Sequence, residues 1–260
     1  MVTRGAGQHL SVCGVIPVRM ESRRLPGKPL LPICGDAMLG WVYRRARQSP
    51  ALDRLLVATD SQQIVSYCKD NKLEVVLTSS HHASGTDRLV EVMEQEASAG
   101  RAADIYVNIQ GDEPMVTAAH IELLLKGLAS PNGSIQVSTL KVAISATAAG
   151  DPNAVKVVTD PRGRALYFSR APIPYDRDPS GQAAYHKHLG FYAYTIDALR
   201  CFRTLEPSPL ERIEHLEQLR FLENGIPIVV LETDQDTIGV DTEEDLGRVE
   251  EYFSGKGVSG

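Results

Sequence analysis

The stretch VCGVIPVRMESRRLPGKPLL, residues 12–31, decides how the rest of the chain is interpreted. Residues 12–18 form an apolar run with the β-branched content of a buried strand. The run gives way to a loop that carries four cations and a glycine: Arg19, Arg23, Arg24, Lys28 and Gly27. Backbone N–H groups and fixed cations after a buried strand suit a polyphosphate, although most basic loops are merely solvated. Arginine suits the first interpretation, because its planar fork donates two parallel hydrogen bonds to phosphate.

The order of residues in this loop narrows the interpretation. The pattern is Pro17-x-Arg19-x-x-Ser22-x-Arg24-Leu25-Pro26-Gly27-Lys28-Pro29. It resembles the nucleotide loop of the CMP-Kdo synthetases, the 3-deoxy-manno-octulosonate cytidylyltransferases. The glycine pairs that mark the loops of sugar-1-phosphate and molybdopterin nucleotidyltransferases are not present in the sequence. The resemblance implies four nucleotide contacts in the loop: Arg19, Ser22, Arg24 and Lys28.

Length, composition and charge limit the class of protein. The 260 residues are 43% hydrophobic and 23% charged, which is the composition of an ordinary globular domain. The net charge of −6 argues against a nucleic-acid partner. The four cysteines form no Cys-x-x-Cys pair, so free thiols in a reducing cytosol are expected. Since no apolar run reaches the roughly 18 residues needed to span a bilayer, we expect a cytoplasmic protein without a membrane partner.

Apolar periodicity predicts the fold. Strand-like runs end near residues 18, 58, 77 and 109, and helix-like stretches separate them. This alternation predicts an α/β fold, a Rossmann-like nucleotidyltransferase sheet that is mostly parallel, with ligands at the carboxyl ends of its strands. Four further strand-like runs from residue 135 onward lack long helices between them and predict an antiparallel extension: residues 135–142, 154–159, 165–168 and 189–195.

The same pattern predicts the last helices and strand of the chain and the bounds of its domain. A helix over 209–223 and a strand over 226–231 precede a last helix over 242–253, with Thr242 as its cap. We expect one nucleotidyltransferase domain over residues 12–253, in which 135–205 form a sub-lobe for sugar binding and dimerisation. Residues 1–11 and 254–260 are expected to be loose tails.

Two aspartates follow apolar runs where loops leave the predicted sheet. Asp112 stands in NIQGDEP, residues 108–114, and Asp241 stands in GVDTEEDL, residues 239–246. Alone, the first suits a turn and the second a helix cap. Both segments resemble those that supply the metal aspartates of the CMP-Kdo synthetases. The resemblance implies Mg²⁺ held by Asp112 and Asp241, and Gln110 as a nucleotide contact. Mg²⁺ is usually held by one or two carboxylates plus substrate phosphates. Without it the two carboxylates should stand unpaired and repel each other.

Three further segments resemble the sugar site of the same family. SGTDR, residues 84–88, places an arginine that would grip a carboxylate with two bonds, or would simply point outward from a capped helix. YHKHLGFY, residues 185–192, contains a His-x-His pair, but a metal role has little support because no third ligand is nearby. LEQLR, residues 216–220, places two polar residues in an apolar helix. The resemblance implies five sugar contacts: Arg88, His188, Tyr192, Glu217 and Gln218.

The resemblance implies an enzyme, a magnesium-dependent nucleotidyltransferase. It would transfer CMP from CTP to the anomeric hydroxyl of Kdo (3-deoxy-manno-octulosonate), release pyrophosphate and activate Kdo for lipopolysaccharide synthesis. Four residues would be catalytic: Arg19, Lys28, Asp112 and Asp241. Such enzymes are generally homodimers, and residues 135–195 are the candidate interface. The loop over 172–185 departs from the family pattern.

Three alternatives stay open at this point. The acceptor could be another ulosonic acid, such as 8-amino-Kdo or a nonulosonic acid. Metal-dependent glycosyltransferases use Asp-x-Asp triplets, and two stand at residues 176–178 and 234–236, but both lie late in polar stretches that read as surface. A nucleotide-sensing protein without catalysis is the third alternative, and the intact aspartate pair argues against it.

Overall fold

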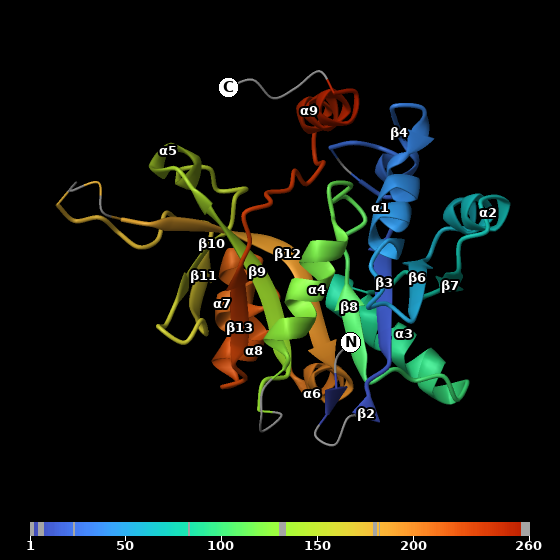
Figure 1. The fold of residues 1–260 in the computed structure, drawn as a ribbon, viewed down its shortest axis with the longest axis horizontal. Helices are drawn as coiled ribbons and strands as arrows, with labels where there is room; N and C mark the ends of the chain where they lie inside the picture. Colours follow the sequence, from blue (N-terminus) through green and yellow to red (C-terminus); the bar gives the residue numbers. More distant parts are fainter. Residues whose placement is uncertain are drawn as a thin grey trace. The chain divides into compact units, whose positions relative to one another are not determined.

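The computed structural model describes residues 3–4, 8–22, 24–82, 84–129, 134–178, 181 and 183–255 (Figure 1). The chain divides into two compact units. We call residues 10–122 and 237–260 the parallel unit, and residues 1–9 and 123–236 the antiparallel unit, after their sheets. Among the described residues, no helix combines the length and the apolar character needed to cross a membrane. Arg23, predicted in the basic loop, lies outside the described residues, as do residues 256–260 of the predicted C-terminal tail.

The parallel unit holds four strands in the order β8-β3-β6-β7, and every pairing among them is parallel. The strands are β3 (Val12–Val18), β6 (Arg54–Thr59), β7 (Val75–Leu77) and β8 (Ile105–Asn108). Val15 and Ile16 are adjacent on β3, so their side chains face opposite sides of the sheet, and both are fully buried. Both faces of β3 are therefore covered, as expected for a parallel sheet.

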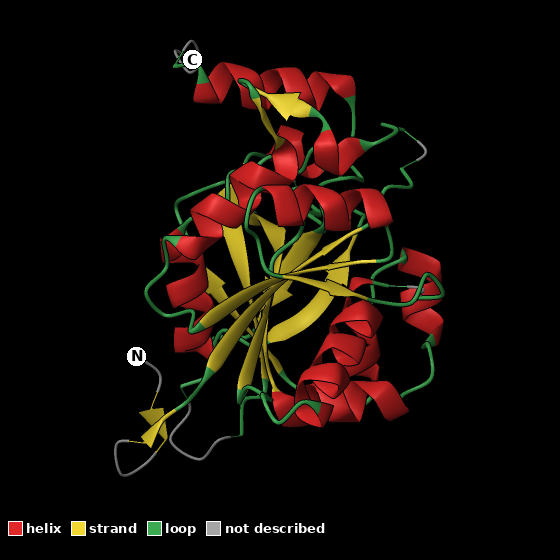
Figure 2. Ribbon diagram, turned by 90° about the vertical axis from the view of Figure 1, so that its right-hand side faces the viewer, coloured by secondary structure: helices red, strands yellow, loops and turns green. Residues whose placement is uncertain are grey.

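Helices and short hairpin strands complete this unit, and helices flank strands in Figure 2. The elements are the 3-10 helix η1 (Lys28–Leu30), β4 (Pro32–Ile33), β5 (Asp36–Ala37), α1 (Met38–Arg47), α2 (Gln62–Asp70), α3 (Gly85–Ser98), α4 (Ala118–Gly127) and α9 (Glu243–Phe253). α4 crosses the sequence boundary between the two units.

The antiparallel unit holds β11-β10-β12-β9-β13, and only the β9–β13 pairing among these strands is parallel. The strands are β9 (Val137–Ile144), β10 (Lys156–Thr159), β11 (Ala165–Ser169), β12 (Tyr185–Thr195) and β13 (Ile228–Glu232). Its further elements are β1 (Thr3–Arg4), β2 (Gln8–His9), α5 (Ala146–Ala149), α6 (Ile196–Thr204), α7 (Pro209–Glu214) and α8 (Leu219–Glu223). β1 pairs with β2 inside the predicted N-terminal tail.

The predicted helix over 209–223 is wrong in one respect, because it breaks into α7 and α8. His215 takes a left-handed conformation with φ 52°, which few non-glycine residues adopt. The side chain of Arg170 explains the break, since its Nε donates to the carbonyl of Glu214 over 2.8 Å. The Glu214 carboxylate in turn accepts from Ser169 Oγ over 2.6 Å. Arg170 therefore has a structural role in the unit, where it ties β11 to the end of α7.

The apolar run before Asp241 does not form a strand. Residues 238–240 are apolar, but they form an irregular segment. Their apolar character serves packing instead of strand pairing, because Val240 is fully buried in a cluster with side chains of the basic loop and α9.

Candidate active site

A cleft of about 860 Å³ opens in the parallel unit, beyond the carboxyl ends of β3 and β8. This is the place where parallel sheets bind ligands, and the volume lies in the range of small-molecule sites. The cleft brings together eight predicted site residues: Arg19, Ser22, Arg24, Lys28, Arg88, Gln110, Asp112 and Asp241. All the nucleotide and metal residues predicted from the sequence therefore line one cavity.

The basic loop is held in shape by its own backbone. Gly27 has φ 70°, a conformation that glycine adopts without steric cost, and it leads directly into η1. The Lys28 N–H donates to the carbonyl of Leu25 over 3.1 Å. The hydroxyl of Ser22 accepts from the Leu25 N–H over 3.2 Å. Leu25 is only 5% exposed, so the loop is anchored in the core while Arg19, Arg24 and Lys28 line the cleft.

The two predicted metal aspartates converge on Lys28. Its Nζ lies 2.7 Å from Asp112 Oδ2 and 3.0 Å from Asp241 Oδ1. Arg24 pairs with Asp241 Oδ2 over 2.7 Å. Burial acts to lower the pKa of Lys28, but the two carboxylates outweigh burial, and its pKa is raised. The expectation that these carboxylates stand unpaired and repel each other is therefore wrong.

The segment before Asp112 lies tightly against the end of β3. A Cβ on Gly111 would come within 2.1 Å of Val18 Cγ1 and 3.1 Å of the Pro17 carbonyl, so only glycine allows this approach. The Asp112 carbonyl then accepts from the Val240 N–H over 2.9 Å. This hydrogen bond connects the backbones of the two aspartate segments directly, next to the side chains that meet at Lys28.

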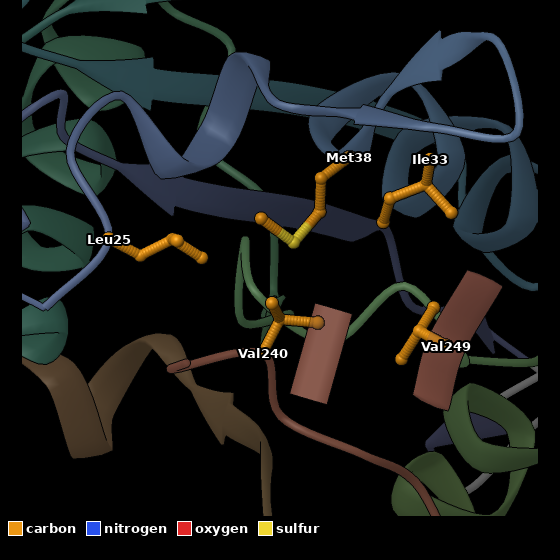
Figure 3. Close-up of a cluster of buried hydrophobic side chains, with 5 residues drawn as sticks. All are labelled: Leu25, Ile33, Met38, Val240 and Val249. Carbon is orange, nitrogen blue, oxygen red and sulfur yellow. The ribbon is translucent and has the colours of Figure 1, made fainter. Parts of the chain in front are cut away.

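α9 positions Asp241. Thr242 caps the helix, and a capping box with Asp245 satisfies N–H groups at its start. Figure 3 shows the cluster that anchors this region, formed by Leu25, Ile33, Met38, Val240 and Val249. Because Leu25 belongs to the basic loop and Val240 precedes Asp241, one apolar cluster positions both the cations and one carboxylate of the site.

An aromatic stack adds a second anchor for α9. The rings of Trp41 on α1 and Phe253 at the end of α9 stack with centroids 4.3 Å apart and planes 14° from parallel. Trp41 Nε1 donates to the Ile33 carbonyl over 2.7 Å, which fixes the orientation of its ring. Such a stacked pair contributes roughly 0.5–1.5 kcal/mol beyond the burial of its area.

The donor set at the base of the cleft fits a hard divalent ion. Two carboxylates approach one point, where Lys28 now supplies the positive charge. Mg²⁺ prefers oxygen ligands and is commonly held by one or two carboxylates plus substrate phosphates. No group of three or more His, Cys, Asp or Glu side chains suited to a metal occurs among the described residues, so substrate oxygens would have to complete the coordination.

Arg88 lies in the wall of the cleft, with its guanidinium already in hydrogen bonds. It is 5% exposed, donates to Asp60 Oδ2 over 2.8 Å and also bonds to Thr78 Oγ1. Ser84 caps α3 by accepting from the Asp87 N–H, which fixes the turn before Arg88. The end of the strand at Asp60 was expected at the ligand edge, but the sequence did not reveal that Asp60 and Thr78 are the partners of Arg88.

The other predicted sugar residues lie in the antiparallel unit. His188 and Tyr192 share one face of β12, with ring centroids 5.3 Å apart. His188 Nε2 is 3.0 Å from Thr139 Oγ1, a partner that the sequence did not reveal. Burial, and then the charge of Lys187, lower the pKa of His188 to about 3, so the ring is neutral at pH 7.

Burial, and then the charges of Tyr194 and Glu217, raise the pKa of Tyr192 well above its ordinary value. Its hydroxyl therefore keeps its proton. Gln218 is the N-cap residue that precedes α8 and is 5% exposed, and its Nε2 has no hydrogen-bond partner among the described residues. The antiparallel unit thus brings the rings of His188 and Tyr192 together, and Glu217 is near enough to raise the pKa of Tyr192.

The two Asp-x-Asp triplets lie in the antiparallel unit, outside the cleft. Asp234 and Asp236 are exposed, and Asp236 pairs with Lys187 over 2.7 Å. Asp178 is exposed too. These positions agree with their interpretation as surface.

The geometry is that of a nucleotidyltransferase, and the chain belongs to the cytidylyltransferase family, since a model of that family matches residues 13–233. It is 55% identical to the 3-deoxy-manno-octulosonate cytidylyltransferase of Acidobacterium capsulatum over 244 residues, which cover 94% of this chain and 97% of that protein. The enzyme of the same name from Koribacter versatilis is 53% identical over 239 residues, covering 92% and 88% of the two chains.

Solved structures agree with the sequences. A CMP:2-keto-3-deoxy-manno-octonic acid synthetase complexed with CTP is 43% identical, with a TM-score of 0.88 that covers 95% of this chain and 99% of that chain. A cytidylyltransferase from Leptospira borgpetersenii, 19% identical with a TM-score of 0.61 over 96% and 89% of the chains, shares the fold. The family resemblance, the α/β fold with its antiparallel strands and the nucleotidyltransferase class are thereby confirmed.

Proposed function

We propose that this enzyme transfers CMP from CTP to the anomeric hydroxyl of Kdo and releases pyrophosphate. The observation that carries the proposal is the convergence of Lys28, Asp112 and Asp241 at the base of a cleft that the basic loop borders. The similar structure in complex with CTP and the names of the relatives support the choice of substrates. Another ulosonic acid and a glycosyltransferase are less favoured, because neither is named among these relatives.

The basic loop would bind the triphosphate. Arg19, Arg24 and Lys28 line the cleft and offer guanidinium and ammonium donors to phosphate oxygens, and Gln110 lines the same cleft. Charge grows on the pyrophosphate as it leaves, and cations held in place by the fold stabilise that charge without reorganisation. Because η1 and Leu25 anchor the loop, most of its ordering cost is met before the nucleotide arrives. Ser22 would contribute through its hydroxyl, which already supports the turn.

We assign Mg²⁺ to Asp112 and Asp241, the two carboxylates that meet at Lys28. When bound, the ion supplies charge neutralisation at the phosphates and Lewis acidity toward a hydroxyl. The cleft residues orient the nucleotide and hold its charge.

We assign the sugar acid to Arg88, His188, Tyr192, Glu217 and Gln218. The Tyr192 hydroxyl keeps its proton and can donate, and the neutral His188 ring can donate or accept one hydrogen bond. The buried Nε2 of Gln218 is a donor available to a sugar oxygen. Buried groups of this kind favour a polyhydroxylated ligand, since a ligand without hydroxyls would leave them unpaired.

We further propose a cytoplasmic homodimer that supplies activated Kdo for lipopolysaccharide synthesis. The antiparallel unit exposes three large apolar side chains, Leu166 at 62%, Tyr175 at 85% and Ile213 at 75%. Light scattering at micromolar concentration should give about twice the 28.4 kDa of one chain. A species of one chain's mass alone would contradict the dimer.

Pyrophosphate release from a panel of substrates tests the proposed reaction. CTP, UTP, ATP and GTP are each combined with Kdo, 8-amino-Kdo and a nonulosonic acid. We expect release with CTP and Kdo at the highest kcat/KM. A preference for another acid would mean that this acid, and not Kdo, is the acceptor. Transfer from a nucleoside diphosphate sugar without pyrophosphate release would favour a glycosyltransferase.

A further inference from the structure

Lys28 stands where a divalent ion would bind. Its Nζ contacts one oxygen of Asp112 and one of Asp241, and Arg24 contacts the other oxygen of Asp241. Two cations of the protein thus take up three of the four carboxylate oxygens of the pair. Only 14% of the Lys28 side chain is exposed, so solvent screens its contacts less than it screens those of Arg24, which is 56% exposed.

We propose that Lys28 is an internal cation that keeps a divalent metal away from Asp112 and Asp241 until a triphosphate draws its ammonium off the carboxylates. The inference rests on the proposed function and adds an order of events to it. The metal would bind with the nucleotide or after it, and the enzyme alone would bind metal weakly.

The charges of the site explain why the nucleotide is needed. Asp112 and Asp241 carry two negative charges, which Lys28 and Arg24 balance with two positive ones. A divalent ion approaching this neutral set meets an ammonium instead of open carboxylates. A triphosphate changes the balance in two ways, because its oxygens accept from the ammonium and also serve as ligands of the ion.

The side chain of Lys28 can leave the carboxylates while its backbone stays in place. Its N–H bonds to the Leu25 carbonyl over 3.1 Å, and its carbonyl accepts from the Leu31 N–H over 3.2 Å. The four-carbon stem of lysine is flexible and its ammonium is a point charge with three rotatable donors. Release of the carboxylates therefore needs rotations within one side chain and no unfolding of the loop.

Binding of Mn²⁺ without nucleotide, followed by electron paramagnetic resonance, tests the proposal. Lys28→Met keeps most of the length of the side chain and removes its charge. Lys69→Met makes the same change in charge at an exposed position on α2 and is the matched control. By Coulomb's law in water, a unit positive charge about 4 Å from a bound divalent ion weakens the affinity of the site for that ion roughly 30-fold. We expect Lys28→Met to bind Mn²⁺ about that much more tightly than the wild type, and Lys69→Met to match the wild type.

The aspartate variants separate failure of this inference from failure of the proposed metal site. Asp112→Asn and Asp241→Asn, each added to Lys28→Met, should remove the gained affinity. Equal Mn²⁺ affinity in the wild type and Lys28→Met, with weaker binding in the aspartate variants, would overturn the role of Lys28 and leave the metal site standing. Tight binding in Lys28→Met that neither aspartate variant weakens would overturn the metal assignment itself.

A measurement on the wild-type protein avoids any folding defect of the variants. The ¹⁵N-detected signal of the Lys28 ammonium should shift when CTP is added and should stay in place when Mg²⁺ is added alone at millimolar concentration. A shift with Mg²⁺ alone would show that the ion displaces the ammonium without help, which contradicts the proposal.

Discussion

Replacing both Asp112 and Asp241 should give non-additive losses. The loss of rate should be smaller than the sum of the two single losses, and the loss of stability should be larger. For turnover, Asp112→Ala and Asp241→Ala should each cost about 10³-fold, or about 4 kcal/mol. Because the carboxylates serve one site, the double variant should be scarcely slower than either single variant.

For stability, the contacts of Lys28 predict that the double variant loses more than the two single variants together. Each single variant leaves the ammonium one carboxylate, and since Asp112 is 34% and Asp241 44% exposed, each loss should be only about 0.5–1 kcal/mol. The double variant leaves an ammonium that is 14% exposed without either carboxylate, which should cost about 2–3 kcal/mol, more than the sum of the single losses.

The assay combines initial rates of pyrophosphate release with urea unfolding of the wild type, both single variants and the double variant. Additive losses of rate, or a fully active Asp241→Ala, would show that Asp241 only precedes the cap of α9 and does not act in the reaction. A gain of stability in either single variant would mean that repulsion between the carboxylates outweighs their attraction to Lys28.

Three further predictions follow from contacts described above. Arg88→Ala should raise the KM for the sugar acid roughly 10- to 100-fold and leave the KM for CTP unchanged. A raised KM for CTP instead would mean that Arg88 binds the nucleotide. Phe253→Ala should destabilise the protein by about 1–2 kcal/mol and shift the emission of Trp41, the single tryptophan, to longer wavelength; unchanged emission would mean that the stack is not formed in solution. His188 should make the protein less stable as the pH falls from about 6.5 toward 3, because the ring is protonated in the unfolded chain but stays neutral in the folded one. His188→Gln should remove that part of the acid sensitivity, and an unchanged dependence of stability on pH would contradict the lowered pKa.

Local sequence was enough to predict the elements whose signals are local. The alternation of apolar runs and helix-like stretches predicted the parallel sheet, and the run over residues 12–18 predicted β3 with the same bounds. Thr242 and Asp245 predicted the start of α9 through a capping box that the structure contains. These signals act over a few residues, so they can be read without knowing the fold.

Features that depend on distant contacts could not be predicted. The left-handed His215 follows from the hydrogen bonds of Arg170, which lies on another strand. Lys28 meets carboxylates 84 and 213 positions away, so the sequence marked these residues as candidates but did not show that the lysine neutralises the pair. The partners of Arg88 were missed for the same reason, because Asp60 and Thr78 reach it from other strand ends.

The linkage formed in the product is the most direct test of the proposed reaction. The enzyme is incubated with CTP, Mg²⁺ and Kdo labelled with ¹³C at the anomeric carbon, and the product is observed by ¹³C and ³¹P NMR. We expect a single phosphodiester in which the anomeric carbon couples to the phosphorus of CMP, with one pyrophosphate released per molecule of product. A product with two phosphates between nucleoside and sugar, or an unchanged anomeric signal while CTP is consumed, would contradict it.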